Sequence, residues 1–278
     1  MAAFQDRPPR NINTDLVDSI EAKHKEERVV WLLGAGFSKP LGGPLFSELL
    51  SPKVAPWVNS WLASKDVPEA RHPEEAVGIF IDGKKAGLWD DAEECLSMID
   101  DAVADPTTMK VIGSTLHMHL GRGEIERMRR VMRHFVGAAT AHFVARVVEA
   151  GVLPESWGPF LLWADTLSDR DSIISFNYDR VVEHLLKLKG RKPAVLAKLH
   201  GTVPEALADD IRDDKDLSSI ATPGPGKSKN MDETRTEAWD NAAVALKNAQ
   251  RLVVIGYSFP ASALCANMSE TVAPWKLE

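Results

Sequence analysis

The residues best suited to chemistry in this sequence stand directly after four short apolar segments. These stretches hold glycine or small polar and ionisable residues: Gly34-Ala35-Gly36-Phe37-Ser38, Asn177-Tyr178-Asp179, His200-Gly201-Thr202 and Gly256-Tyr257-Ser258-Phe259-Pro260. If the apolar segments are parallel strands, their carboxyl ends meet at one edge of a sheet, where the ligands of such sheets bind. We therefore expect the four stretches to form a single site.

The first stretch has the composition of a turn that holds a phosphate. Gly34 and Gly36 would let backbone amides approach a pyrophosphate without a Cβ in the way. The same glycines also suit a tight turn between strand and helix that binds no ligand. The oxidoreductase pattern G-x-G-x-x-G is not met, because position 39 is lysine and no ribose-binding acid is clear some twenty residues later. A hydride-transferring enzyme is therefore disfavoured.

His200 and Asn177 are the candidates for catalysis. His200 ends an apolar segment and precedes glycine, so we expect its imidazole to lie over the sheet edge, where it can accept a proton near neutral pH. Asn177 takes the equivalent place after the neighbouring segment, and its amide can hold a water or a ribose hydroxyl. Two alternatives stay open: Asn177 could cap the following helix, and Asp179 would serve equally well as an acid of its first turn.

The elements that must position these residues alternate between strand and helix. Apolar runs predict strands at 28–33, 172–176, 194–199 and 251–255. Helical patterns are expected at 12–27, 179–189, 234–249 and 260–268. This alternation predicts an α/β fold, a Rossmann-like parallel sheet with helices on both faces. We divide the chain into a lead-in helix at 1–27 and one domain at 28–278.

A large all-helical insertion interrupts the α/β pattern. Residues 52–150 carry apolar positions three and four apart and show no strand signal. Trp57, Trp61 and Trp89 in this block could form a surface for self-association or a partner, although core packing is the commoner explanation for tryptophan. The stretch at 205–230 is acidic and then rich in glycine and proline, and we interpret it as a mobile loop.

Composition and charge exclude several classes of function. The chain has 278 residues and a formal net charge of −7, without a basic tract that would bind nucleic acid directly. No apolar run is long enough to span a bilayer, and the N-terminus lacks the apolar core of a signal peptide. Cys95 and Cys265 are the only cysteines, too few for a four-thiolate zinc site. We therefore expect a cytoplasmic protein without membrane contact and without a bound metal.

The motifs "GAGFS", "SFNYD", "KLHG" and "IGYSFP", in this order and spacing, resemble those of the sirtuin-like NAD hydrolases of bacterial anti-phage defence. The resemblance covers most of residues 28–268, and the family has a Rossmann-like core with a helical insertion. It implies that NAD is the substrate, that no other cofactor is needed, and that the catalytic residues are Asn177, Asp179 and His200. It implies that the phosphates, the adjacent ribose and the adenosine are bound by Gly34, Ala35, Gly36, Ser38, Gly256 and Ser258.

The activity that this resemblance implies is hydrolysis of NAD to nicotinamide and ADP-ribose, by an effector that depletes NAD in abortive infection. Nicotinamide leaves as a neutral group from an oxocarbenium-like transition state, so no general acid is needed on it. In this hypothesis Asn177 positions a water, and His200 takes up the proton of that water, directly or through a ribose hydroxyl. Asp179 orients the carboxamide or the ribose. Activity would be gated by homo-oligomerisation, a bound nucleotide signal or a separate sensor protein.

Two other functions are alternatives. A non-catalytic sensor of NAD or ADP-ribose would keep the glycines but would not need Asn177 and His200. A protein deacylase is disfavoured, because deacetylating sirtuins carry a four-cysteine zinc ribbon and an acidic and arginine pair where this chain reads Pro44-Leu45-Phe46-Ser47. Ala261-Ser262-Ala263 also replaces an acidic residue that relatives tend to have, which leaves the adenosine contacts less defined.

Overall fold

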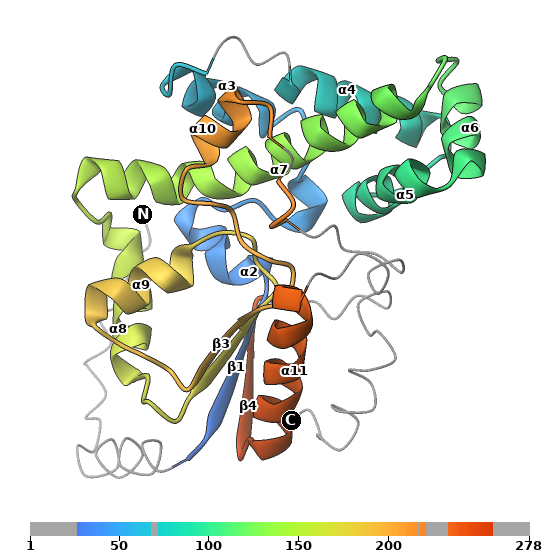
Figure 1. Ribbon diagram of the computed structural model, residues 1–278. Helices are drawn as coiled ribbons and strands as arrows, with labels where there is room; N and C mark the ends of the chain where they lie inside the picture. The colour runs from blue at the N-terminus through green and yellow to red at the C-terminus, as the bar shows by residue number, and fades with distance from the viewer. Residues whose placement is uncertain (1–26, 68–71, 216, 221–232, 258–278) are drawn as a thin grey trace, which may run out of the picture.

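The computed structural model describes residues 27–67, 72–215, 217–220 and 233–257 (Figure 1). Within these ranges one parallel sheet has the strand order β3-β2-β1-β4. The strands are β1 (Val29–Leu33), β2 (Ser172–Ser175), β3 (Val195–Lys198) and β4 (Arg251–Ile255). Each lies within two residues of the segment that the apolar runs predict, and the predicted parallel sheet is confirmed.

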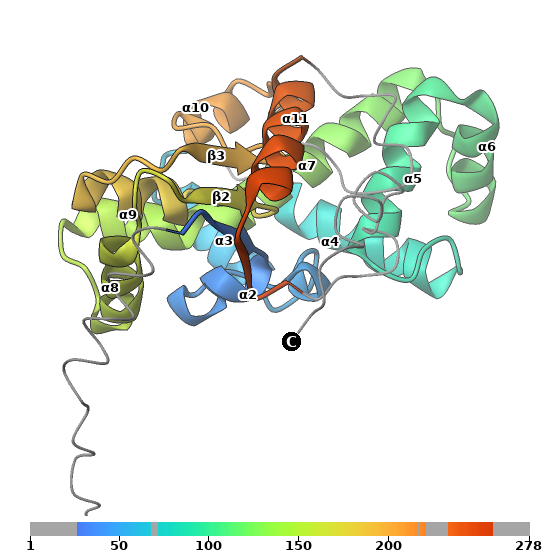
Figure 2. The same cartoon turned by 90° about the horizontal axis from the view of Figure 1, so that it is seen from below.

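Helices cover both faces of this sheet, as predicted (Figure 2). Alternate residues of β1 point to opposite faces, as the period of two along a strand requires. Trp31 and Leu33 pack with η3 (Glu155–Trp157), α8 (Gly158–Thr166) and α9 (Val181–Lys189). Val30 and Leu32 pack with α11 (Glu233–Asn248) on the other side. Because β1 is buried on both faces, its sequence is a continuous apolar run rather than an alternating one.

The helical insertion is also confirmed, and in Figure 1 it lies beyond the carboxyl ends of the strands. Its helices are α3 (Ala55–Ala63), α4 (His72–Lys85), α5 (Ala92–Ala104), α6 (Pro106–Thr115) and α7 (Arg122–Ala150). Local capping fixes where they begin: Asp91 accepts the Glu94 amide at the start of α5, and Asp105 accepts the Thr107 amide at the start of α6. The long α7 ends at Gly151, whose φ is +64°.

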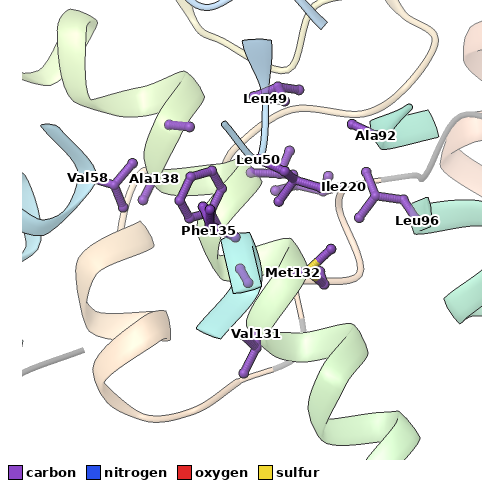
Figure 3. Packing of buried hydrophobic residues seen from close by; sticks show 14 of the residues in the cluster. Leu49, Leu50, Val58, Ala92, Leu96, Val131, Met132, Phe135, Ala138 and Ile220 are labelled. Atoms are coloured by element: carbon purple, nitrogen blue, oxygen red, sulfur yellow. The ribbon is translucent and has the colours of Figure 1, made fainter. Parts of the chain in front are cut away.

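The insertion has a hydrophobic core of its own, built around α7. Figure 3 shows Met132 and Phe135 of α7 among side chains from α3, α5 and the segment at 49–50. Full burial of such side chains contributes about 1.5–3 kcal/mol each, which is enough to hold the unit together. Farther along α7, Phe143 and Val144 join the core between the sheet and α9 instead. The insertion and the sheet therefore share α7 and are not separable units.

The interpretation of 205–230 as a mobile loop is wrong for its first part. Residues Leu207–Arg212 form α10, and Leu207, Ile211, Leu217 and Ile220 are buried in the core of the helical insertion. Leu207 and Ile211 stand four residues apart, on one face of the helix. The acidic residues between them kept this short apolar stripe from being recognised. Residues 221–230 lie outside the described part.

Other predictions also fall outside the described residues. They concern the lead-in helix up to residue 26, the last helix at 260–268, Cys265 and Ser258.

Two short elements follow β1 and α2 (Ala35–Ser38): η1 (Lys39–Leu41) and η2 (Phe46–Glu48). Within the described ranges no single helix has the length and apolar character of a membrane span. One bent pair, α7 with η3–α8, reaches that threshold by length and composition only.

Candidate active site

The carboxyl ends of the strands bring the predicted site residues to one edge of the sheet. Strand pairing aligns one row across the sheet: Lys198, Ser175, Leu33 and Ile255. Gly34 and Gly256 follow this row by one residue. Asn177 and His200 follow the row by two residues, at the ends of β2 and β3. These two strands are neighbours in the sheet, and neighbouring strands lie about 4.8 Å apart. The described parts of the four stretches thus lie at one edge of the sheet, and that they form a single site stays a prediction.

Asn177 joins the end of β2 to the glycine turn after β1. Its Nδ2 donates to the Gly34 carbonyl at 3.0 Å and to the Ser38 hydroxyl at 3.1 Å. The side chain is buried, and so is that of Ser38. The amide nitrogen is therefore directed across the sheet edge, at the glycine turn and α2. The alternative that Asn177 caps the following helix is not what the structure shows.

Asp179, separated from Asn177 by Tyr178 in the sequence, belongs to the same cluster. The Ser38 hydroxyl is near enough to its carboxyl to lower the pKa, and its Oδ1 accepts the Val181 amide at 3.1 Å. The bond with Val181 ties Asp179 to the start of α9, but Asp179 precedes the helix, and the acid of its first turn is Glu183. Ser38, Asn177 and Asp179 thus form one buried polar cluster between α2 and α9.

Burial dominates the electrostatics of Asp179. Removal from water raises the pKa of its carboxyl above the ordinary value, because the charged form loses hydration. The nearby Lys198 charge acts in the opposite direction, and so do the hydrogen bonds from Ser38 and Val181. A carboxyl whose pKa is raised in this way can be held neutral to higher pH and can then donate a hydrogen bond.

Sequence reasoning missed the groups that support Asp179. Lys198 donates its Nζ to the Asp179 carbonyl at 2.5 Å and lies 3.5 Å from the Glu183 carboxylate. Thr202 donates to the Tyr178 carbonyl at 3.2 Å and lies 3.3 Å from Glu183. Lys198 was visible in the "KLHG" motif, and Glu183 follows Asp179 by one helical turn. Their pairing joins β3 to α9, so a pattern local to either element could not predict it.

His200 lies among aromatic rings at this edge. Its ring centroid is 5.2 Å from that of Phe176, edge to face, and 6.0 Å from that of Tyr178. Phe176 is in turn stacked on Tyr257, with ring centroids 4.2 Å apart. His200 as a residue is 9% exposed, so it is more buried than a position over the edge implied. The imidazole therefore faces a partly apolar, aromatic environment.

The glycines of the turn are packed against the end of β4. The Gly36 amide donates to the Gly256 carbonyl at 2.9 Å, and a Cβ on Gly36 would lie 2.7 Å from the Gly256 Cα. Gly256 has a φ of +64°, and a Cβ there would lie 2.2 Å from the Phe37 amide nitrogen. This close approach of two backbones requires glycine whether or not a phosphate binds. The assignment of Gly34 and Gly36 to a pyrophosphate stays a prediction.

Ala35 and Gly36 are the part of the turn that solvent reaches, whereas Gly34 and Ser38 are buried. A ligand approaching the turn would therefore contact Ala35 and Gly36 first. Ser258 lies outside the described residues, so its predicted contact with adenosine has no geometry. Among the described residues, no three histidine, cysteine, aspartate or glutamate side chains are grouped to hold a metal ion.

Comparison with known proteins gives no family for this chain. No protein-family model matches it, and no curated protein matches it either. The chemistry of the site therefore rests on its geometry and on the motif resemblance described above.

Proposed function

We propose that this protein hydrolyses NAD to nicotinamide and ADP-ribose. The observation that carries the proposal is the buried polar cluster of Ser38, Asn177 and Asp179, which lies with His200 at the carboxyl edge of a parallel sheet. Such an edge is where ligands of open α/β sheets bind. The motifs that resemble those of sirtuin-like NAD hydrolases contain all three of these residues and the histidine.

The proposed reaction requires the protein mainly to position the substrate and a water. Nicotinamide departs as a neutral molecule, and the remaining ribose carries the positive charge of an oxocarbenium ion. A water held near Asn177 then attacks the anomeric carbon. His200 accepts the proton that this water loses, directly or through a ribose hydroxyl. Asp179, with its raised pKa, is suited to orient the carboxamide of nicotinamide or a ribose hydroxyl.

Aromatic rings around His200 support this arrangement. Phe176, Tyr178 and Tyr257 give the edge of the sheet an apolar character next to polar side chains. Nicotinamide is a flat heterocycle with a polar amide, and sites for such ligands combine apolar walls with a few placed polar groups. The phosphates would lie toward Ala35 and Gly36, the solvent-accessible part of the turn.

The biological setting follows from the same resemblance. An enzyme that destroys NAD without control would harm its own cell, so we propose a gated effector of anti-phage defence that acts in the cytoplasm. The gate is a homo-oligomer, a nucleotide signal or a separate sensor protein. Direct nucleic-acid binding is not part of the proposal, because the chain has a formal net charge of −7.

A second candidate is a sensor domain that binds NAD or ADP-ribose without cleaving it. The engagement of Asn177 with Gly34 and Ser38, and of Asp179 with Val181, favours a supporting role for these side chains. A sensor and a hydrolase share their ligand and differ only in turnover. Turnover is therefore the quantity that separates them.

The proposal is tested by incubating the purified protein with NAD, with and without an acetylated peptide, and measuring free nicotinamide. A hydrolase releases nicotinamide at the same rate in both mixtures. Release only with peptide would indicate a deacylase. Binding of NAD by calorimetry without any release would indicate the sensor.

A further inference from the structure

The segment that carries Asn177 and Asp179 belongs to no regular element. Residues 177–179 lie between β2 and α9, outside both. The buried backbone carbonyls of such a segment need hydrogen-bond donors from elsewhere in the fold. These donors matter for a site, because a side chain is held only as precisely as the backbone that carries it.

Donors for this segment come from the end of β3 and the residues that follow it. The Tyr178 carbonyl accepts the Val203 amide at 2.9 Å. The Asp179 carbonyl accepts a hydrogen bond from the Lys198 ammonium, with Nζ and O 2.5 Å apart. Lys198 is the last residue of β3 and is paired in register with Ser175, the last residue of β2. It therefore holds the neighbouring chain at a point four residues beyond its own partner in the sheet.

The charge of Lys198 is balanced by Glu183 of α9. Nζ lies 3.5 Å from the Glu183 carboxylate, and the two side chains are 12% and 21% exposed. The pair Lys39–Glu48 at the surface is 45% and 39% exposed. Exposed pairs contribute little to stability, whereas removal of one partner from a shielded pair leaves the other charge uncompensated. Glu183 therefore allows a lysine to stand at this poorly solvated position.

Lys198 contacts the backbone of Asp179, and the side chains of the segment are held by other groups. The Asn177 amide donates to the Gly34 carbonyl, and the Asp179 carboxylate accepts the Val181 amide. The glycine turn and α9 thus orient the two side chains, while β3 fixes the backbone between them. Any effect of Lys198 on a reaction would therefore be indirect, through the placement of Asn177 and Asp179.

We propose that Lys198 is a positioning residue of the candidate active site, which holds the backbone of residues 177–179 where the reaction requires it. Glu183 compensates the charge of the lysine and is not itself needed for positioning. The expected effect on rate rests on the proposed hydrolysis of NAD, but the anchoring of the segment does not. The competing explanation is that the two residues only stabilise the fold as an ion pair, and removal of the whole pair separates the two.

The experiment compares Lys198→Met, Glu183→Gln and the double variant. Lys198→Met removes the hydrogen bond and leaves Glu183 uncompensated, so it should lower both the melting temperature and the rate. The double variant lacks that charge and should regain part of the lost melting temperature. Its single-turnover rate of NAD cleavage should stay about a hundredfold below that of the wild type, since a misplacement of about 1 Å can cost that much. Glu183→Gln alone keeps the lysine and should retain most of the rate.

Binding and a matched control separate misplaced groups from a damaged fold. ADP-ribose should bind the double variant and the wild type with similar affinity, because its phosphates are expected at the glycine turn. Lys189→Met is the control: it removes an ion pair with Asp165, of 2.5 Å, from the other end of α9. It should leave the rate unchanged.

A readout without NAD keeps the test apart from the proposed function. Lys198 of β3 and Ser38 of α2 lower the pKa of the Asp179 carboxyl, whereas burial and Glu183 of α9 raise it. With Glu183 already replaced by Gln, loss of Lys198 should raise this pKa further, so ionised Asp179 costs more free energy of folding. The double variant should therefore be less stable than Glu183→Gln at pH 8. This gap should shrink as the pH falls toward the unfolded pKa of about 3.9, where the carboxyl becomes neutral.

Two results would overturn the proposal. A double variant that cleaves NAD at the wild-type rate would reduce Lys198 to an ion-pair partner of Glu183. A stability gap of the same size at pH 8 and pH 4 would mean that the lysine does not act on Asp179 in the folded chain. A wild-type chain that leaves NAD intact but shows the pH-dependent gap would contradict the proposed function and support the anchoring by Lys198.

Discussion

The burial of Asp179 suits the chemistry proposed for it, but it lowers the stability of the fold when the carboxyl is ionised. The carboxyl is buried, and burial raises its pKa despite the charge of Lys198 and the hydrogen bond from Ser38. A group whose pKa is higher in the folded chain than in the unfolded one binds protons more tightly when folded. Its ionised form therefore costs free energy of folding at pH values above the folded pKa. The cost disappears below the unfolded pKa of about 3.9.

We predict that Asp179→Asn raises the melting temperature at pH 8 while it lowers NAD cleavage. The amide oxygen can still accept the hydrogen bond of Val181, and the side chain carries no buried charge. The gain in melting temperature should shrink as the pH falls toward 4, because wild-type Asp179 then becomes neutral as well. Asp101→Asn, at an exposed position of α5, is the control and should show little pH-dependent gain. A melting temperature of Asp179→Asn below that of the wild type at pH 8 would contradict this account.

His200→Ala is expected to lower the rate of NAD cleavage about a hundredfold to ten-thousandfold, the usual contribution of a general acid or base. Binding of ADP-ribose should be retained, since the phosphates are expected to be held at the glycine turn. His119→Ala is the matched control, because His119 is exposed between α6 and α7 and far along the chain from the site. Near-normal turnover of the His200 variant would remove this residue from the mechanism.

At the scale of elements, the close packing of two strand ends defines the glycine turn. The turn after β1 and the end of β4 approach so closely that a Cβ on Gly256 would lie 2.2 Å from the Phe37 amide nitrogen. A bulky side chain at Gly36 would collide with the same strand end, because even a Cβ there would lie 2.7 Å from the Gly256 Cα. Such a side chain should first impair folding, and it should affect NAD binding only through the loss of folding.

Gly256→Ala should therefore destabilise the chain strongly without any ligand. A left-handed φ costs a non-glycine residue on the order of 1–3 kcal/mol, and the overlap with the Phe37 amide adds to this cost. Gly190→Ala isolates the first effect, because Gly190 has a φ of +60° and open space around it. Chemical denaturation should show a larger loss of unfolding free energy for Gly256→Ala than for Gly190→Ala. Equal losses would mean that the strand ends are less tightly packed than described.

Some elements were predicted correctly from the sequence and others were missed, and the difference has a physical reason. β1 and most of β4 are continuous apolar runs followed by glycine, and β2 carries two isoleucines between serines. Short apolar segments of this kind are a local signal for a parallel strand. The helix α10 was missed because only Leu207 and Ile211 mark its buried face. Within the site, residue type and position after a strand identified Asn177, Asp179 and His200. The support from Glu183 and Lys198 arises between distant elements, and no local pattern encodes it.

At the scale of the whole molecule, the tryptophans of the helical insertion divide into two groups. Trp61 and Trp89 are buried, and the Trp89 indole donates to the Phe80 carbonyl at 2.8 Å. Core packing explains these two. Trp57 is 53% exposed on α3 and remains a candidate for contact with another chain, since exposed tryptophan is enriched at interaction hot spots.

We predict that the chain self-associates through the surface around Trp57. Light scattering after size-exclusion chromatography should give a mass above the 30.6 kDa of one chain, and Trp57→Gln should lower it toward that value. Leu162→Gln is the control, because Leu162 is an exposed apolar residue of α8, away from α3 in sequence and in the fold. A wild-type chain that stays monomeric at high concentration, alone and with a candidate partner, would refute the prediction.

The most direct test of the central claim is a single-turnover measurement with the protein in excess over NAD. Excess protein makes even a slow, ungated turnover visible, so the result does not depend on finding the activating signal. We predict that NAD disappears and that nicotinamide and ADP-ribose form in equal amounts, with the reaction strongly slowed by His200→Ala. NAD that binds but is recovered intact after prolonged incubation with folded wild-type protein would contradict the claim and would leave a sensor of NAD as the better description.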